Sequence, residues 1–102
     1  MPDDVQSLIA SLKQAALLDA PTEAAFRAIP RAAFLPDIPP DQIYKDEAVP
    51  IKFDEDGTVL SSSSQPSMMA IMLRQLQLQR GHNVLEIGTG SAYQTAILCE
   101  LA

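Results

Sequence analysis

The stretch Val84-Leu85-Glu86-Ile87-Gly88-Thr89-Gly90-Ser91-Ala92 predicts a strand that passes through a tight glycine turn into a helix. Residues 84–87 combine three apolar side chains with one acid at the end, which is typical of a buried strand. Gly88 and Gly90 have no Cβ atom, so the backbone can turn sharply there and approach a ligand closely. A helical run follows over 93–101. Strand, turn and helix in this order begin a nucleotide- or cofactor-binding βα unit.

The glycine turn matches neither of two common phosphate-binding loops. A dinucleotide fingerprint would read G-x-G-x-x-G, whereas this chain has Gly88-x-Gly90-x-Ala92 with Glu86 upstream. No G-K-[ST] follows, so the turn is not a Walker loop. A tight connection between strand and helix that binds no ligand remains the alternative interpretation.

Composition excludes several classes of protein. With 102 residues, the chain is one domain at most or part of one, and 47% apolar residues are enough for a globular core. A net charge of −6 argues against nucleic-acid binding, which needs Lys and Arg to neutralise phosphate. The acidic N-terminus does not resemble a signal peptide, and no apolar run reaches the ~20 residues of a membrane span. We therefore expect a cytoplasmic protein that binds neither nucleic acid nor membrane.

Cysteine and histidine are too few for most reactive sites. Cys99 is the single cysteine, so no internal disulfide can form, and we expect it to be a small core residue. His82 is the single histidine. A metal site and a Cys/His catalytic pair therefore have no support.

Apolar periodicity predicts the elements that precede the glycine turn. Asp3 or Asp4 is expected to cap the first helix, and Gly81 to end the last helix before the turn. The predicted elements are a helix over about 4–18, a short helix over about 20–29, a further turn at 31–34, a hairpin with arms at 48–53 and 58–60, and a helix over about 66–78.

The glycine motif, read from residue 84 to residue 96, closely resembles the first motif of protein-L-isoaspartate O-methyltransferases, which use S-adenosylmethionine. The resemblance extends from about residue 5 to the end of the chain, and several matches in the same order are more specific than one. The other segments that match are Ala25–Pro36, similar to the N-terminal signature of that family, Tyr44–Ile51, similar to the segment that follows it, and Ser63–Pro66, similar to its active-site Ser-Gln-Pro segment.

The resemblance implies an α/β fold, the N-terminal part of a Rossmann-like class I methyltransferase. Residues 1–80 would form a helical segment with the hairpin and the active-site helix, and 81–102 the first, incomplete βα unit. The acid that binds the ribose in this family ends a second strand, beyond residue 102, as does most of the parallel sheet. We therefore expect a fragment, from a shortened protein or gene product, that neither binds cofactor tightly nor turns over alone.

The resemblance also assigns roles to individual residues. Ser64 matches the active-site serine, which would hold the substrate carboxylate, and Ser62 would assist. A simpler role for Ser64 is helix capping. The family usually has glycine at Ala92, where a methyl group would crowd the turn if φ is positive. The cofactor-binding residues implied are Glu86, Gly88, Thr89, Gly90 and Ser91.

The implied activity is S-adenosylmethionine-dependent methylation of L-isoaspartyl carboxylates in damaged proteins, a repair reaction whose partner is a protein or peptide that bears isoaspartate. The sulfonium methyl is electrophilic and a carboxylate is ionised near pH 7, so alignment matters more than a strong base. Two alternatives remain open. One is a non-catalytic helical binding module, and the other is a related methyltransferase that acts on acidic side chains of a modified peptide.

Overall fold

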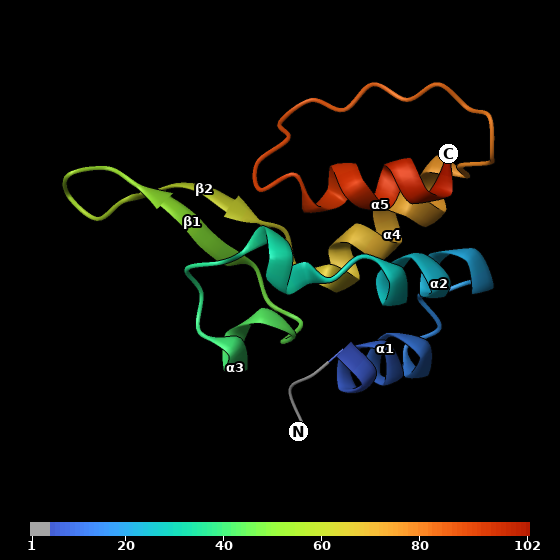
Figure 1. Cartoon of the computed structure of the whole chain (residues 1–102), viewed down its shortest axis with the longest axis horizontal. Helices are drawn as coiled ribbons and strands as arrows, with labels where there is room; N and C mark the ends of the chain where they lie inside the picture. Colours follow the sequence, from blue (N-terminus) through green and yellow to red (C-terminus); the bar gives the residue numbers. More distant parts are fainter. Residues whose placement is uncertain (1–4) are drawn as a thin grey trace.

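The helices of the protein pack together, and one β-hairpin projects from them (Figure 1). Its structure, a computed structural model, describes residues 5–102. In chain order the elements are α1 (Val5–Gln14), α2 (Ala20–Ala28), the 3-10 helix η1 (Arg31–Phe34), α3 (Pro40–Ile43), β1 (Val49–Phe53), β2 (Val59–Ser63), α4 (Pro66–Leu76) and α5 (Tyr93–Leu101).

The first two helices confirm the predicted periodicity. The α1 helix buries Leu8, Ile9 and Leu12 on one face, but it ends at Gln14, earlier than predicted. The chain cannot continue as a helix because Ala16 has a φ of +59°. The expected caps of this helix, Asp3 and Asp4, lie outside the described residues.

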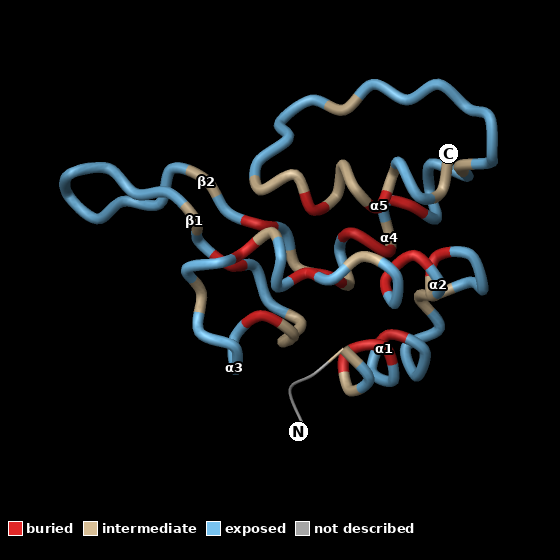
Figure 2. Tube along the Cα trace, in the orientation of Figure 1, coloured by how far each residue is buried: buried red, intermediate tan, exposed pale blue. Residues whose placement is uncertain are grey.

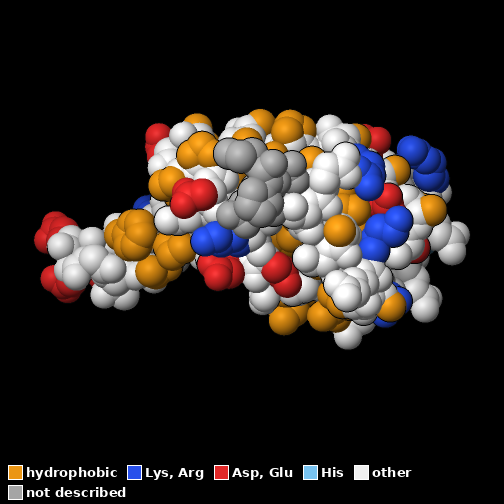
Figure 3. Space-filling model, turned by 90° about the horizontal axis from the view of Figure 1, so that it is seen from below, with side chains coloured by type: hydrophobic (Ala, Val, Ile, Leu, Met, Phe, Trp, Pro, Cys, Tyr) orange, Lys and Arg blue, Asp and Glu red, His pale blue; other side chains and the backbone are white. Residues whose placement is uncertain are grey.

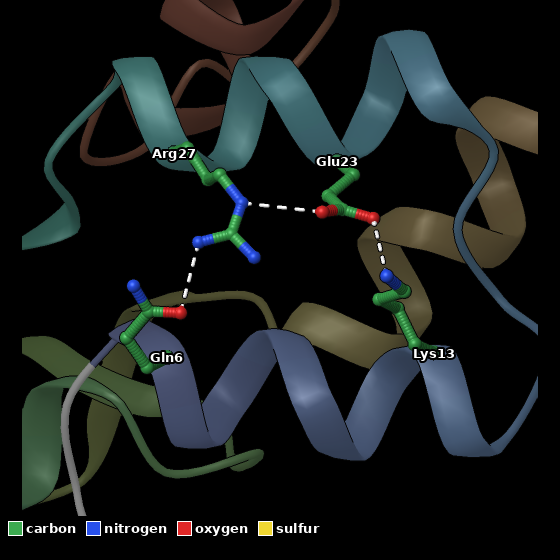
Figure 4. Close-up of polar contacts among 4 residues, drawn as sticks. All are labelled: Gln6, Lys13, Glu23 and Arg27. Carbon is green, nitrogen blue, oxygen red and sulfur yellow. Dashed lines mark hydrogen bonds and ion pairs between the residues drawn. The ribbon is translucent and has the colours of Figure 1, made fainter.

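Polar contacts join α1 and α2 along their solvent side (Figure 4). Glu23 on α2 pairs with Lys13 on α1 at 3.2 Å and with Arg27 one turn further along its own helix at 3.2 Å. The Nη1 of Arg27 also donates to Oε1 of Gln6 at 2.9 Å. The pKa of Glu23 is lowered, first by Lys13 and then by Arg27. These exposed pairs orient the two helices but add little stability.

One hydrophobic core joins helices from both ends of the chain. Tyr93 and Ile97 of α5 lie at its centre, and the Tyr93 ring meets the ring of Phe26 edge-on at 6.3 Å between centroids. Figure 2 shows the buried segments of α1, α2, α4 and α5 facing one another. The buried members of this core are Ile9, Ala25, Phe26, Met69, Leu73, Tyr93 and Ile97.

The predicted hairpin is confirmed. Strands β1 and β2 pair in antiparallel fashion, with Val49 opposite Ser63 and Pro50 opposite Ser62. At the turn, Oδ1 of Asp54 accepts hydrogen bonds from the backbone N–H groups of Asp56 and Thr58, each at 2.9 Å. The far end of the hairpin projects away from the helices, whereas its near end lies beside the start of α4 (Figure 1).

The predicted strand at residues 84–87 is wrong. This segment has no regular secondary structure and belongs to a long loop between α4 and α5 (Figure 1). The side chains that were expected to be buried are exposed, Leu85 at 85% and Ile87 at 88%. A strand of a parallel sheet needs hydrogen-bonded neighbours on its edges, and no strand within residues 5–102 pairs with this segment. The helix of the expected βα unit does form, as α5.

Two smaller expectations also fail. Helix α4 ends at Leu76 because Gln77 takes the left-handed conformation with a φ of +52°, whereas Gly81 lies beyond the helix and donates its N–H to the carbonyl of Ala102 at 2.8 Å. Cys99 is exposed rather than buried.

The helices of the described chain are short. The longest, α4, has 11 residues. None of the helices within residues 5–102 has the length and apolar character that crossing a bilayer requires.

Candidate functional site

A single cavity brings the predicted site residues together. It has a volume of about 390 Å³ and lies between the end of β2, helix α4, the loop before α5 and α5 itself. All seven residues expected to bind substrate or cofactor line this cavity: Ser62, Ser64, Glu86, Gly88, Thr89, Gly90 and Ser91. Residues more than twenty positions apart in the sequence therefore share one hollow of the structure.

The glycine turn has the backbone conformation that its sequence predicts. Gly88 and Gly90 have φ values of +79° and +56°, a region that side chains with a Cβ rarely adopt. Gly90 also lies near the hairpin, since a Cβ atom built on it would be 3.7 Å from the carbonyl oxygen of Ser62. The turn thus presents bare backbone to the cavity beside the serine segment.

Ala92 is strained, as its departure from the family pattern suggested. Its φ is +70°, and it stands at the N-cap position of α5. Its N–H donates to the carbonyl of Thr89 at 2.9 Å, and its carbonyl accepts from the N–H of Ala96 at 3.0 Å. These bonds hold an alanine in a conformation that costs an L-residue roughly 1–2 kcal/mol.

Glu86 is held in place by the helix that follows the turn. Its Oε1 accepts a hydrogen bond from the hydroxyl of Thr95 on α5. Glu86 is partly buried, whereas its neighbours Leu85 and Ile87 are exposed. The carboxylate is therefore the one side chain of residues 84–87 that is anchored to the body of the protein through a hydrogen bond.

The serine segment alternates between the interior and the cavity. Ser63 is buried, and the hydroxyl of Ser91 donates to its Oγ at 3.3 Å. Ser62 and Ser64 are exposed and line the cavity. The same Ser91 hydroxyl accepts from the N–H of Tyr93 at 3.4 Å, so it ties the hairpin to the start of α5.

The capping role considered for Ser64 is not observed. Gln65 occupies the N-cap position of α4, and no side chain there makes the capping hydrogen bond. Instead, Oδ1 of Asp46 accepts from the N–H of Ser67 at 2.7 Å, and the Gln65 side chain donates to the carbonyl of Asp46 at 2.9 Å. A residue about twenty positions upstream caps this helix, and the Ser64 hydroxyl is left facing the cavity.

Arg31 is the site-forming residue that the sequence prediction missed. Its guanidinium is fully buried and donates to three carbonyl oxygens, those of Ser64 at 3.2 Å and of Lys45 and Glu47 at 3.4 Å each. It also lies over the ring of Tyr93, at 5.8 Å from the centroid. One signal was available in the sequence, since Arg31 is a lone charge between Pro30 and an apolar run.

Burial shifts the pKa values of Arg31 and Tyr93 in opposite directions. It lowers the pKa of Arg31, although Tyr93 and Asp46 act in the opposite direction. It raises the pKa of Tyr93, so the phenol stays neutral. The Nε of Arg31 is buried without a hydrogen-bond partner. The arginine is thus a buried cation that holds together the loop at 45–47 and the backbone of Ser64.

The rest of the cavity wall is mostly apolar. Ligand sites commonly combine such a wall with a few well-placed polar groups, and their volumes begin at about 300 Å³. Within residues 5–102 no group of three His, Cys, Asp or Glu side chains is placed to hold a metal ion. The arrangement suits an organic ligand with an apolar body. The apolar residues that line the cavity are Met69, Met72, Leu73, Leu76, Val84, Leu85, Ile87 and Leu98.

Known proteins resemble this chain in sequence. A protein-L-isoaspartate O-methyltransferase of Christiangramia forsetii is 38% identical over 96 residues, which are 94% of this chain and 42% of that protein. A protein-L-isoaspartate O-methyltransferase of Rhodopseudomonas palustris is 46% identical over 79 residues, 78% of this chain and 34% of that protein. The chain therefore spans less than half the length of these relatives.

A solved structure resembles the fold. It is described as a putative protein-L-isoaspartate O-methyltransferase from Plasmodium falciparum in complex with S-adenosyl-L-homocysteine, and it matches with a TM-score of 0.75 at 25% identity. The match covers 94% of this chain and 41% of that one. The sequence profile of one family, protein-L-isoaspartate(D-aspartate) O-methyltransferase, matches residues 3–102. The glycine turn, the serine segment and these matches agree, and the chain belongs to the protein-L-isoaspartate(D-aspartate) O-methyltransferase family.

Proposed function

We propose that this chain is part of an S-adenosylmethionine-dependent carboxyl methyltransferase that methylates L-isoaspartyl residues in damaged proteins. The observation that carries the proposal is the cavity in which Ser62 and Ser64 face the glycine turn. The relatives named for this activity support it, and so does the S-adenosyl-L-homocysteine, the demethylated cofactor, bound in the similar structure from Plasmodium falciparum. The partner would be a protein or peptide that contains isoaspartate.

The residues of the turn fit such a cofactor. Gly88 and Gly90 offer backbone without side chains, Thr89 and Ser91 offer hydroxyls, and Glu86 offers a carboxylate for a ligand with hydroxyl and ammonium groups. S-adenosylmethionine, when bound, supplies an electrophilic methyl group on a positively charged sulfur. We assign these five residues to cofactor binding, in the Rossmann-like part of such an enzyme, where the turn leads into α5.

The proposed role of Ser64 and Ser62 is to orient the substrate carboxylate. A carboxylate is ionised near pH 7 and needs no base to become a nucleophile. Its alignment in a mostly apolar cavity then accounts for much of the acceleration. Arg31 supports this alignment because its guanidinium holds the carbonyl of Ser64 at 3.2 Å. None of these steps requires proton abstraction by the chain.

We further propose a functional division at residue 80. Residues 1–80 would supply the substrate side and residues 81–102 the cofactor side, although α5 shares the hydrophobic core of the first part. A cytoplasmic location fits the chemistry of the lone, exposed thiol of Cys99, which has no disulfide partner.

Methyl transfer to a defined peptide tests the proposed function. Because these 102 residues are not expected to turn over alone, a longer polypeptide that carries this chain and the rest of the sheet would be incubated with radiolabelled S-adenosylmethionine and either an isoaspartyl peptide or the same peptide with ordinary aspartate. We expect Ser64→Ala to reduce transfer to the isoaspartyl peptide. Ser61→Ala is the matched control, since Ser61 belongs to the same run but does not line the cavity. Equal labelling of the two peptides would contradict the proposed substrate.

Cofactor binding can be measured on these 102 residues without turnover. Leu85 and Ile87 are exposed beside the turn, so we expect weak affinity for S-adenosylhomocysteine, on the order of 1 mM. A titration followed by amide NMR detects binding in this range. Shifts should be concentrated at residues 86–91, and Gly90→Val should abolish them. A titration that moves only signals remote from this turn would exclude it as the cofactor site.

A further inference from the structure

A second hollow adjoins the proposed methylation site. It has a volume of about 280 Å³ and lies between the segment after η1 and strand β1. Figure 3 shows hydrophobic side chains gathered where the hairpin joins the body of the protein. We call this hollow the hairpin groove, and its principal apolar lining residues are Phe34, Leu35, Ile38, Pro50, Ile51 and Phe53.

Two links connect the hairpin groove with the cavity. Ser91 lines both of them, and its hydroxyl contacts Ser63 at 3.3 Å. In the hairpin, Pro50 of the groove pairs directly with Ser62 of the cavity. Paired Cα atoms on antiparallel strands are only about 4.5–5.5 Å apart. A peptide residue next to one held at Ser62 would therefore reach the groove.

The size and chemistry of the hairpin groove suit one side chain. Its volume is slightly below the ~300 Å³ at which small-molecule sites begin, so it is too small for a whole cofactor but large enough for one aromatic ring. Asp37 is the only charged side chain among the residues that line it. Phe53 is 54% exposed, so its ring is available to a ligand.

We propose that the hairpin groove binds a large apolar side chain that flanks the isoaspartyl residue of the peptide substrate. The inference rests on the proposed function, because the cavity must hold the isoaspartyl group for its neighbour to enter the groove. The groove then acts as a specificity subsite. Burying an aromatic side chain there removes apolar surface from water on both partners.

Peptide binding tests the subsite directly. Short isoaspartyl peptides would carry phenylalanine or alanine beside the isoaspartate, on either side, and binding would be followed by amide NMR. We expect one phenylalanine peptide to bind roughly fivefold to tenfold more tightly than its alanine counterpart, the effect of partly burying one ring. Binding of this peptide should shift the amide signals of the protein at Ile51 and Phe53 as well as at the residues that line the cavity.

Two matched variants locate the effect. Phe53→Ala should remove most of the advantage of the phenylalanine peptide. Leu60→Ala should retain it, because Leu60 is equally exposed, at 56%, lies on the same hairpin and lines neither hollow. Both side chains are exposed, so both variants should keep the fold, which their spectra would verify.

The outcomes separate the subsite from the proposed function. Equal affinity for phenylalanine and alanine peptides, or an advantage that survives Phe53→Ala, would overturn the subsite while leaving isoaspartyl recognition intact. If aspartyl and isoaspartyl peptides bind alike, the proposed function fails. In that case a phenylalanine advantage sensitive to Phe53→Ala would describe a general apolar peptide site, and the subsite as stated here would also be overturned.

Discussion

Replacing Arg31 by methionine should destabilise the protein strongly. The guanidinium is fully buried and joins three carbonyl oxygens from two separate segments, Lys45 and Glu47 on one side and Ser64 on the other. Methionine fills similar space but donates no hydrogen bond. The three carbonyls would lose this donor, and the ring of Tyr93 would lose its cation.

The magnitude follows from these contacts. The three bonds are long, at 3.2 to 3.4 Å, so we assign each about 1 kcal/mol, and the cation over the aromatic ring contributes about 1 kcal/mol. Relief of the unpartnered Nε returns about 1 kcal/mol. The expected loss is therefore about 3 kcal/mol. At roughly 5 °C per kcal/mol for a domain of this size, Tm should fall by about 15 °C.

Arg27→Met is the matched control. Arg27 precedes Arg31 by four residues and contacts Glu23 at 3.2 Å and Gln6 at 2.9 Å, but these contacts lie on the surface (Figure 4). We expect the Arg27→Met variant to have almost the same stability as the parent protein. Arg31→Lys should not restore stability, because one ammonium group cannot reach three carbonyls from two segments as a guanidinium fork does.

Urea unfolding followed by circular dichroism measures the difference, and amide NMR reports on the site. In Arg31→Met the signals of Ser64 and Gln65 should move, whereas Arg27→Met should leave them in place. Replacing a buried charge by an apolar side chain sometimes stabilises a protein. If Arg31→Met were as stable as Arg27→Met, the argument that the buried arginine holds the serine segment would be refuted.

Substitutions at three further positions test local features. Ala92→Gly should stabilise the protein by roughly 1 kcal/mol in urea unfolding, because glycine tolerates the φ of +70°; a loss of stability would contradict the strain. Asp46→Ala should cost about 1 kcal/mol and Asp46→Asn much less, since Asp46 caps α4 at Ser67; equal costs would exclude capping. Asp19→Ala should also cost about 1 kcal/mol at neutral pH, because Asp19 caps α2 at Thr22. The Thr22 hydrogen bonds lower the pKa of Asp19, so this contribution is complete above about pH 4 and is lost as pH falls further. A difference between Asp19→Ala and the parent that persists unchanged to pH 2 would contradict this linkage.

Local features of the structure could be predicted from residue order. The helices α1, α2, α4 and α5 were anticipated from apolar periodicity, and the hairpin from its turn residues Asp54 to Gly57. A sharp turn at Gly88 and Gly90 was also anticipated, and the structure gives both residues a positive φ. These features depend on interactions between residues a few positions apart, and such interactions are present in the sequence pattern itself.

The sequence predicted which residues line the candidate site, but not which residues hold them in place. Ser62, Ser64 and the glycine turn were named through the family resemblance, and they meet at one cavity. Arg31 and Asp46 were not named, although they anchor the serine segment. Their partners lie 14 to 33 positions away in the sequence, and no local pattern indicates which distant carbonyl or N–H group a side chain will reach.

Residues 84–87 show that a local pattern can also predict an element that does not form. Their apolar pattern is typical of a buried strand. Yet a strand exists only where another strand offers hydrogen bonds to its edges, and none within residues 5–102 does so for this segment. Amino-acid order was therefore sufficient for the helices, the hairpin and the turn, whose bonds are local. Strand formation, the placement of Arg31 and the cavity itself depend on which distant segments come into contact.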